Sequence, residues 1–184
     1  ANECSDKNKY DICLVSQHSS GIFNDIKNDK LKNNLELIDK NLSKYLSTHK
    51  NLSFLVSCRS TRDSDGGKFE QEYFKSVFGQ RAKLCFQDDF KFSTYKGMTE
   101  STVIISCYST CAAEALGWGK KVLFCDYSTN NIFADYKMGI WLTTNSDYEV
   151  FSDKVTEIIS MEKSKYKSQT ADYSSHIMAY DSER

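Results

Sequence analysis

One stretch of the chain, residues 101–125 (STVIISCYSTCAAEALGWGKKVLFC), constrains the possible folds more than any other. Two apolar runs within it, residues 103–106 and 122–125, have the length and composition of buried strands. The small residues between them favour a short helix, and the glycines that follow are typical of a helix end. The stretch therefore predicts a strand, a helix and a second strand, the repeating unit of parallel sheets.

The helix of this unit is expected to begin at the polar turn Ser109-Thr110. The first N–H groups of a helix lack partners within the helix, and the positive end of the helix dipole adds to them, so a helix start can bind an anion. Glu114 lies one turn further along, on the same face. Phosphates at the helix start and ribose hydroxyls at the carboxylate would suit a nucleotide. An ordinary helix cap followed by a surface glutamate explains the same residues.

The rest of the chain repeats the alternation of strands and helices. Strand-like runs occur at residues 11–16, 52–58, 82–87 and 139–143, and apolar residues at helical spacing occur at 35–46, 69–77, 92–98 and 148–158. Most strand runs are apolar throughout, which predicts strands that are covered on both faces. We expect a single doubly wound (Rossmann-like) α/β domain over residues 1–184, with about six mostly parallel strands. A closing helix is expected at about 147–161, and the polar tail at 163–184 is expected to run over the surface.

The candidate site follows from this fold, because ligands of such sheets bind beyond the carboxyl ends of the strands. The loops expected there are residues 17–21, 59–62, 87–90, 107–110 and 126–131. Three of them carry groups that could bind phosphate: Ser19-Ser20-Gly21, Arg59 and Ser109-Thr110. Arg59 could equally be a surface arginine. His18 could contact a ligand or transfer a proton, or it could be a loop histidine without a role.

Charge and missing motifs exclude several classes of function. The 24 Lys and Arg against 25 Asp and Glu give a net charge of −1, so we expect no nucleic-acid partner and at most peripheral membrane contact. No apolar run approaches the ~18 residues of a spanning helix, and the polar N-terminus is unlike a signal peptide, which predicts a cytoplasmic protein. The glycine motifs of dinucleotide oxidoreductases and P-loop proteins are absent.

The seven cysteines do not indicate a metal site or a disulfide framework. Cys13, Cys58, Cys85 and Cys125 lie inside apolar strand runs, where cysteine acts as a small hydrophobic residue. Their number is odd, and no CxxC pair occurs. We expect reduced cysteines, no metal and no cofactor.

Residues 95–126 resemble the donor-binding, C-terminal half of glycosyltransferases with the GT-B fold. The matching positions are residues 101–106, Ser109-Thr110, Glu114-Ala115-Leu116 and Gly119-Lys120-Lys121-Val122-Leu123. Lys121 stands where these enzymes usually have proline. Within this group the chain is most similar to bacterial surface-carbohydrate biosynthesis proteins. Non-hydrolysing sugar-nucleotide 2-epimerases share the fold and much of the pattern.

The resemblance implies a role for each matching residue. Ser109 and Thr110 would hold the donor phosphates, and Glu114 would bind the ribose. The backbone of Phe86 and Gln87 would contact the base, while Arg59 and the turn at residues 16–20 would face the diphosphate. The predicted nucleotide-sugar contacts are Ser16, Gln17, His18, Arg59, Phe86, Gln87, Ser109, Thr110, Glu114 and Asp126.

The resemblance also implies the strand order 3-2-1-4-5-6 and a nucleotide-activated sugar as ligand. The chain would be the donor-binding domain of a glycosyltransferase for cell-surface polysaccharide, inactive alone and completed by an acceptor-binding half or a partner chain. Two alternatives stay open: a sugar-nucleotide 2-epimerase-like enzyme domain, and a non-catalytic α/β module that binds a partner protein.

Overall fold

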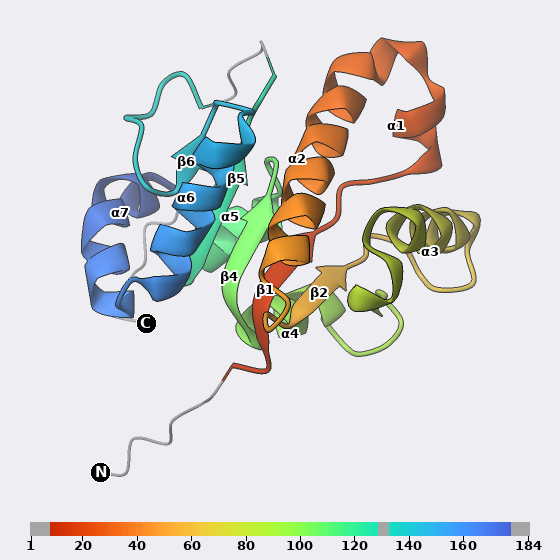
Figure 1. The fold of residues 1–184 in the computed structure, drawn as a ribbon, viewed down its shortest axis with the longest axis horizontal. Coiled ribbons are helices and arrows are strands. Elements are labelled where there is room, and N and C mark those ends of the chain that lie inside the picture. Colours follow the sequence, from red (N-terminus) through yellow and green to blue (C-terminus); the bar gives the residue numbers. More distant parts are fainter. Residues whose placement is uncertain (1–7, 129–132, 178–184) are drawn as a thin grey trace.

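The computed structural model describes residues 8–128 and 133–177, and these form one six-stranded parallel sheet with helices on both faces (Figure 1). The strands are β1 (Tyr10–Val15), β2 (Phe54–Ser57), β3 (Lys83–Cys85), β4 (Ser101–Ser106), β5 (Lys121–Cys125) and β6 (Leu142–Thr143). They lie in the order β3-β2-β1-β4-β5-β6, and every neighbouring pair is parallel. The predicted fold class and strand order are both confirmed.

The helices divide between the two faces of the sheet. They are α1 (Ser20–Asn24), α2 (Asp29–Thr48), α3 (Asp65–Phe78), α4 (Ser93–Thr99), α5 (Thr110–Gly117), α6 (Tyr148–Ser160) and α7 (Lys163–Ile177), with short 3₁₀ turns at Ile26–Asn28 and Gly79–Arg81. Figure 1 shows α2 and α6 in front of the sheet, with α4 and α5 behind it. Covered on both sides, the central strands are fully buried at Ile12, Val103 and Ile104, which explains their continuous apolar runs.

Three strands are shorter than their apolar runs predict. The run at 52–58 gives β2 only at Phe54–Ser57, and local hydrogen bonds account for the other two. The third run was expected at 82–87, but β3 ends at Cys85 because the next N–H, that of Phe86, donates to the Asp89 carboxylate (2.8 Å) rather than to a strand. The last was expected at 139–143, but β6 begins at Leu142, whose N–H donates to the Gly139 carbonyl in a turn (3.2 Å). None of these changes alters the order of the sheet. Residues 129–131 of the expected loop at 126–131 lie outside the described residues.

The segment after α6 was predicted to be a polar tail on the surface. In the structure, residues 163–177 form helix α7 instead. The Tyr166 side chain is buried, and its hydroxyl hydrogen-bonds both the N–H (3.0 Å) and the carbonyl of Val122 in β5. Thr170 and Tyr173 continue the buried side of the helix at helical spacing, and the Tyr173 ring stacks on Trp141 with 3.5 Å between centroids. Because the other residues of this helix are mostly polar, the sequence shows no clear apolar pattern at helical spacing. Residues 178–184 lie outside the described part.

Two lysines lie at the amino end of β5, away from the carboxyl ends of the strands. The Lys121 ammonium donates to the carbonyls of Ile159 (3.1 Å) and Met161 at the end of α6. The Lys120 ammonium donates to the carbonyls of Thr99 (2.6 Å), the last residue of α4, and Ser101 (3.2 Å), the first residue of β4. Burial lowers the pKa of both ammonium groups. A cation at the end of a helix is favourable, so Lys121 has a structural role.

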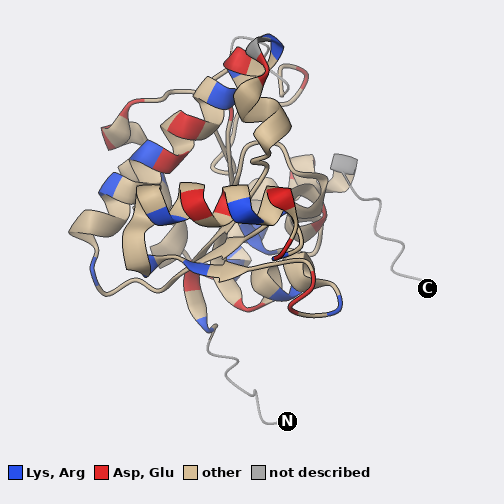
Figure 2. Ribbon diagram, turned by 90° about the vertical axis from the view of Figure 1, so that its right-hand side faces the viewer, with Lys and Arg blue, Asp and Glu red and all other residues tan. Residues whose placement is uncertain are grey.

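Charge is mixed along the surface. On the side shown in Figure 2, basic and acidic residues alternate along the helices and form no broad area of one sign. Among the residues described, no helix combines the length and the apolar character that crossing a membrane would require.

Candidate functional site

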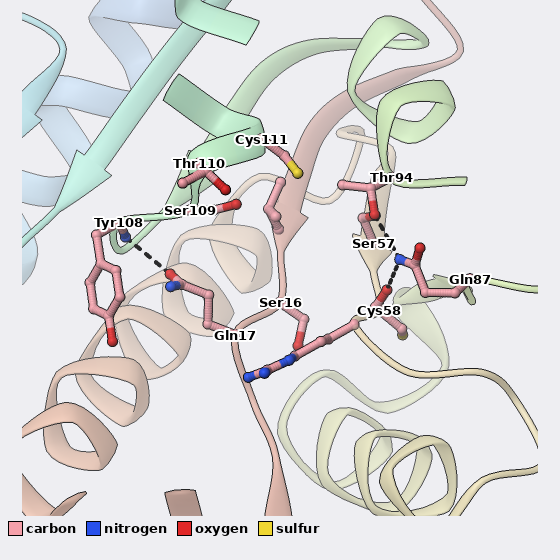
Figure 3. Close-up of a pocket in the computed structure, with 12 residues that line it drawn as sticks. Ser16, Gln17, Ser57, Cys58, Gln87, Thr94, Tyr108, Ser109, Thr110 and Cys111 are labelled. Atoms are coloured by element: carbon pink, nitrogen blue, oxygen red, sulfur yellow. Dashed lines mark hydrogen bonds between the residues drawn. The ribbon is translucent and has the colours of Figure 1, made fainter. Parts of the chain in front are cut away.

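A cavity of about 490 Å³ opens at the carboxyl ends of the central strands (Figure 3). Its lining residues are Val15, Ser16, Gln17, Ser57, Cys58, Arg59, Gln87, Thr94, Tyr108, Ser109, Thr110 and Cys111. The chain leaves β1 toward β2 on one side, and β4 pairs with the other side of β1. The cavity therefore lies at the point where the strand order reverses, which is where open α/β sheets bind ligands.

The start of α5 forms one wall of the cavity. The first backbone bond of this helix runs from the Ala113 N–H to the Ser109 carbonyl (3.0 Å), so the N–H groups of Thr110, Cys111 and Ala112 have no acceptor within the helix. The Ser109 side chain makes no capping bond to them. These donors and the positive end of the helix dipole are suited to an anion.

Arg59 supplies a cation to the same cavity from the loop after β2. Its side chain is exposed, and in the described part of the chain its guanidinium has neither an ion-pair nor a hydrogen-bond partner. The neighbouring Arg62 differs, since the Asp89 carboxylate holds it through two bonds of 2.7 and 2.9 Å. Of these two arginines, Arg59 is thus the one that is available to a ligand.

The wall between β2 and α4 adds uncharged polar groups. The Gln87 amide donates to the Cys58 carbonyl (2.8 Å) and to the Thr94 hydroxyl (2.7 Å), as the dashed lines in Figure 3 show. The Ser57 hydroxyl is buried and has no hydrogen-bond partner in the described structure. A buried polar group without a partner is unfavourable, so a ligand or water at this wall would stabilise the Ser57 hydroxyl.

The turn after β1 connects the loops around the cavity. The Gln17 side-chain oxygen accepts from the Tyr108 N–H (3.0 Å) before α5. His18 lies behind the lining: its Nδ1 is 3.4 Å from the Ser16 hydroxyl and its Nε2 is 2.7 Å from the Asp39 carboxylate. Its ring packs among Phe23, Tyr73 and Phe74. Ser16 and Gln17 line the cavity, and His18 does not.

Three other predicted contacts also lie away from the lining. Phe86 is buried, and Asp89 occupies both its N–H (2.8 Å) and its carbonyl (3.1 Å). Asp126 is buried after β5, where its carboxylate accepts from the N–H and hydroxyl of Ser128. Both are held by their neighbours in the sequence. The structure therefore brings together Ser16, Gln17, Arg59, Gln87, Ser109 and Thr110 from the predicted set.

Glu114, the third, lies directly behind the cavity wall. Its carboxylate accepts from the Tyr95 hydroxyl at 2.6 Å, and this bond raises the pKa of Tyr95. The Cys111 thiol, which lines the cavity, lies 3.8 Å from the same hydroxyl. Glu114 is thus connected to the cavity through Tyr95 and Cys111.

The sequence reasoning missed Ser57, Cys58, Thr94, Tyr108, Cys111 and Val15 as lining residues. Tyr108 falls inside an expected loop, and Ser57 and Cys58 end an expected strand, so position along the strands could have indicated them. Thr94 comes from α4, whose approach to β2 no local pattern reveals. Among the residues described, no group of three or more His, Cys, Asp and Glu could hold a metal ion.

Comparison with solved structures finds chains with a similar fold, of which one has a TM-score above 0.5. The chain is similar to a "putative UDP-N-acetylglucosamine 2-epimerase from Listeria monocytogenes", with a TM-score of 0.54 and 10% identity over 88% of this chain and 40% of that one. It also matches the pneumococcal O-GlcNAc transferase GtfA, solved with UDP and GlcNAc, with a TM-score of 0.48 and 12% identity over 93% of this chain and 32% of that one. The chain thus spans less than half the length of either protein.

Sequence comparison gives the family. No curated protein sequence matches the chain. A family model described as "putative O-antigen biosynthesis protein" matches residues 5–184, nearly the whole chain. The chain therefore belongs to this family.

Proposed function

We propose that this chain is the donor-binding domain of a glycosyltransferase for cell-surface polysaccharide, and that the cavity beside α5 takes the nucleotide-activated sugar. One observation carries the proposal: the helix start at Ser109-Thr110 and the unpartnered guanidinium of Arg59 line one cavity at the reversal point of the sheet. Backbone N–H donors facing an arginine suit a diphosphate, which carries negative charge on several oxygens. The family's link to O-antigen synthesis supports a sugar nucleotide as the source of that diphosphate.

The same groups suit the chemistry of sugar transfer. When the bond between the sugar and the diphosphate breaks, negative charge grows on the departing phosphate. Arg59 and the α5 start both line the cavity and would stabilise that charge. The ribose would lie toward Glu114, where the Tyr95 hydroxyl fixes the carboxylate.

Transfer also needs an acceptor, and we propose that a second half or a partner chain binds it. The chain covers 40% of the epimerase chain, which leaves more than half of that protein without a counterpart here. In this proposal the domain binds the donor without help, but it transfers the sugar only together with the half or partner chain that binds the acceptor.

An epimerase-like function is the second candidate, because the structure with a TM-score of 0.54 carries that name. It would use the same cavity for the same class of ligand. Product analysis with the completed enzyme separates the two: a transferase gives a glycosylated acceptor, and an epimerase gives the isomeric sugar nucleotide.

Calorimetric titration of the chain with UDP, GDP, CMP, CDP and ADP tests the proposal. We expect at least one nucleotide to bind, and Arg59→Ala to weaken that binding roughly 10- to 150-fold, the range for a hydrogen bond to a charged group. Lys50→Ala is the control, because it removes an exposed cation that precedes β2 at the opposite end of the same strand. If no nucleotide binds the unmodified chain, or if both variants bind equally well, the donor-site proposal is wrong.

A further inference from the structure

A buried carboxylate joins two of the loops that form the cavity. Glu70 of α3 is 0% exposed. Its Oε1 accepts from the Ser16 hydroxyl (2.5 Å) and the Arg59 N–H (2.9 Å), and its Oε2 accepts from the Ser60 N–H (2.9 Å). Ser16 follows β1 and Arg59 follows β2, so one side chain fixes the ends of two adjacent strands.

A glycine allows α3 to approach these loops. A Cβ atom at Gly67 would lie 2.0 Å from the Thr61 carbonyl oxygen and 2.6 Å from that of Arg62, so no side chain fits there. Glu70 lies one turn further along on the same face of the helix. The close contact at Gly67 therefore places the Glu70 carboxylate within reach of the Arg59 and Ser60 N–H groups.

The charge of Glu70 opposes the proposed ligand. Burying a carboxylate is unfavourable unless hydrogen bonds satisfy it, and here three donors do. Within the described structure no cation pairs with it. An uncompensated negative charge beside a cavity that takes phosphates would weaken binding by repulsion, so repulsion and loop positioning act in opposite directions on affinity.

We propose that Glu70 is a positioning residue of the donor site, and that its effect on the loops outweighs its repulsion of the ligand. Its carboxylate accepts hydrogen bonds from the N–H groups of Arg59 and Ser60 and so fixes the backbone of this loop. It also holds the Ser16 side chain at the cavity edge. The Arg59 guanidinium then projects from a fixed backbone. This inference rests on the proposed function, because its consequence is measured as nucleotide affinity.

Two variants of Glu70 separate the opposing effects. Glu70→Gln removes the charge and leaves one N–H donor facing an amide N–H₂. Glu70→Asp keeps the charge, but its shorter side chain cannot reach all three donors. Positioning predicts that both variants bind the nucleotide about tenfold or more weakly, whereas repulsion predicts tighter binding for Glu70→Gln and no change for Glu70→Asp. Glu72→Gln, on the exposed side of the same helix, is the control and should not change affinity.

Hydrogen exchange gives a readout that does not depend on the ligand. In both Glu70 variants the Arg59 and Ser60 amides should exchange faster, while the amides of β1 and β4 keep their protection. A variant with lower overall stability alone would instead exchange faster throughout, with unchanged affinity below its melting temperature. If one Glu70 variant does not fold, the other carries both readouts, because Glu70→Gln keeps the length of the side chain and Glu70→Asp keeps its charge.

The outcomes are distinguishable. Equal or tighter nucleotide binding by Glu70→Gln, or unchanged exchange at Arg59 and Ser60, overturns the inference and leaves the proposed function standing. If the unmodified chain binds no nucleotide, the proposed function fails and this inference fails with it, whatever the exchange rates show.

Discussion

At the scale of single residues, Glu114 occupies an unusual place in the site. It is separated from the cavity by Cys111, one turn earlier on α5, and its carboxylate accepts from the Tyr95 hydroxyl at 2.6 Å. Tyr95 remains a donor because this hydrogen bond raises its pKa. The hydrogen bond from Tyr95 thus fixes the orientation of the Glu114 carboxylate. A ribose hydroxyl would be a second donor to it.

Glu114→Ala should weaken nucleotide binding by roughly 1.5–3 kcal/mol, the range for a hydrogen bond to a charged group. Folding should be largely unaffected, since the side chain is only partly buried. Calorimetry and a thermal melt measure the two effects separately.

The matched control is Glu157→Ala, which removes an exposed glutamate from α6 and should change neither quantity. Equal nucleotide affinities of Glu114→Ala and the unmodified chain would rule out the ribose assignment.

At the scale of elements, the strands were predictable and the helix contacts were not. The strands follow from apolar runs, which a parallel sheet covered on both faces requires. Parallel strands place their carboxyl ends at one edge of the sheet. The loops with Arg59 and Ser109 could therefore be predicted to lie at that edge. Thr94 and Glu70 reach the site from helices α4 and α3, whose positions depend on packing against distant strands. His18 was misplaced because Asp39, 21 residues later, holds it inside the fold. Such contacts leave no local signal in the sequence.

Helix α7 is held by one tyrosine in particular. The Tyr166 hydroxyl bonds both backbone groups of Val122, and burial raises its pKa. Tyr166→Phe keeps the ring and leaves those backbone groups without this partner, so we expect the free energy of unfolding to fall by about 1–3 kcal/mol. Urea denaturation followed by circular dichroism measures the change.

Tyr148→Phe provides the comparison, since the structure as described gives the Tyr148 hydroxyl no hydrogen-bond partner. Equal stability of the two variants would show that α7 does not depend on the bond to β5.

At the scale of the whole molecule, buried thiols report on global opening. Cys13 in β1 and Cys125 in β5 are 0% exposed, and burial raises the pKa of each from 9.0 to about 12. Cys111 is partly exposed at the cavity. These cysteines are free, so each can be labelled chemically.

Iodoacetamide must reach a thiol to react with it, so Cys111 should be labelled in the native state, while burial and a raised pKa leave Cys13 and Cys125 unmodified. The two buried thiols should react at the rate of global unfolding. Because their folded pKa is raised, their contribution to stability is complete below pH 9 and is lost as the pH rises toward 12. Mass spectrometry of peptides from timed labelling checks this.

A nucleotide that binds the cavity should slow labelling of Cys111. Rapid native-state labelling of Cys125 would contradict the buried position of β5.

The central place of β1 has a consequence for how the protein is made. On the ribosome, the first three strands emerge before β4, and β4 must then pair with β1, as in the register of Tyr10 with Ser101. Until that happens the apolar edge of β1 has no neighbour, and such edges associate with other chains. Contacts this distant in sequence also form slowly. We therefore expect the nascent chain to be most prone to aggregation in the interval between the synthesis of β3 and that of β4, and to gain most from a chaperone at that time.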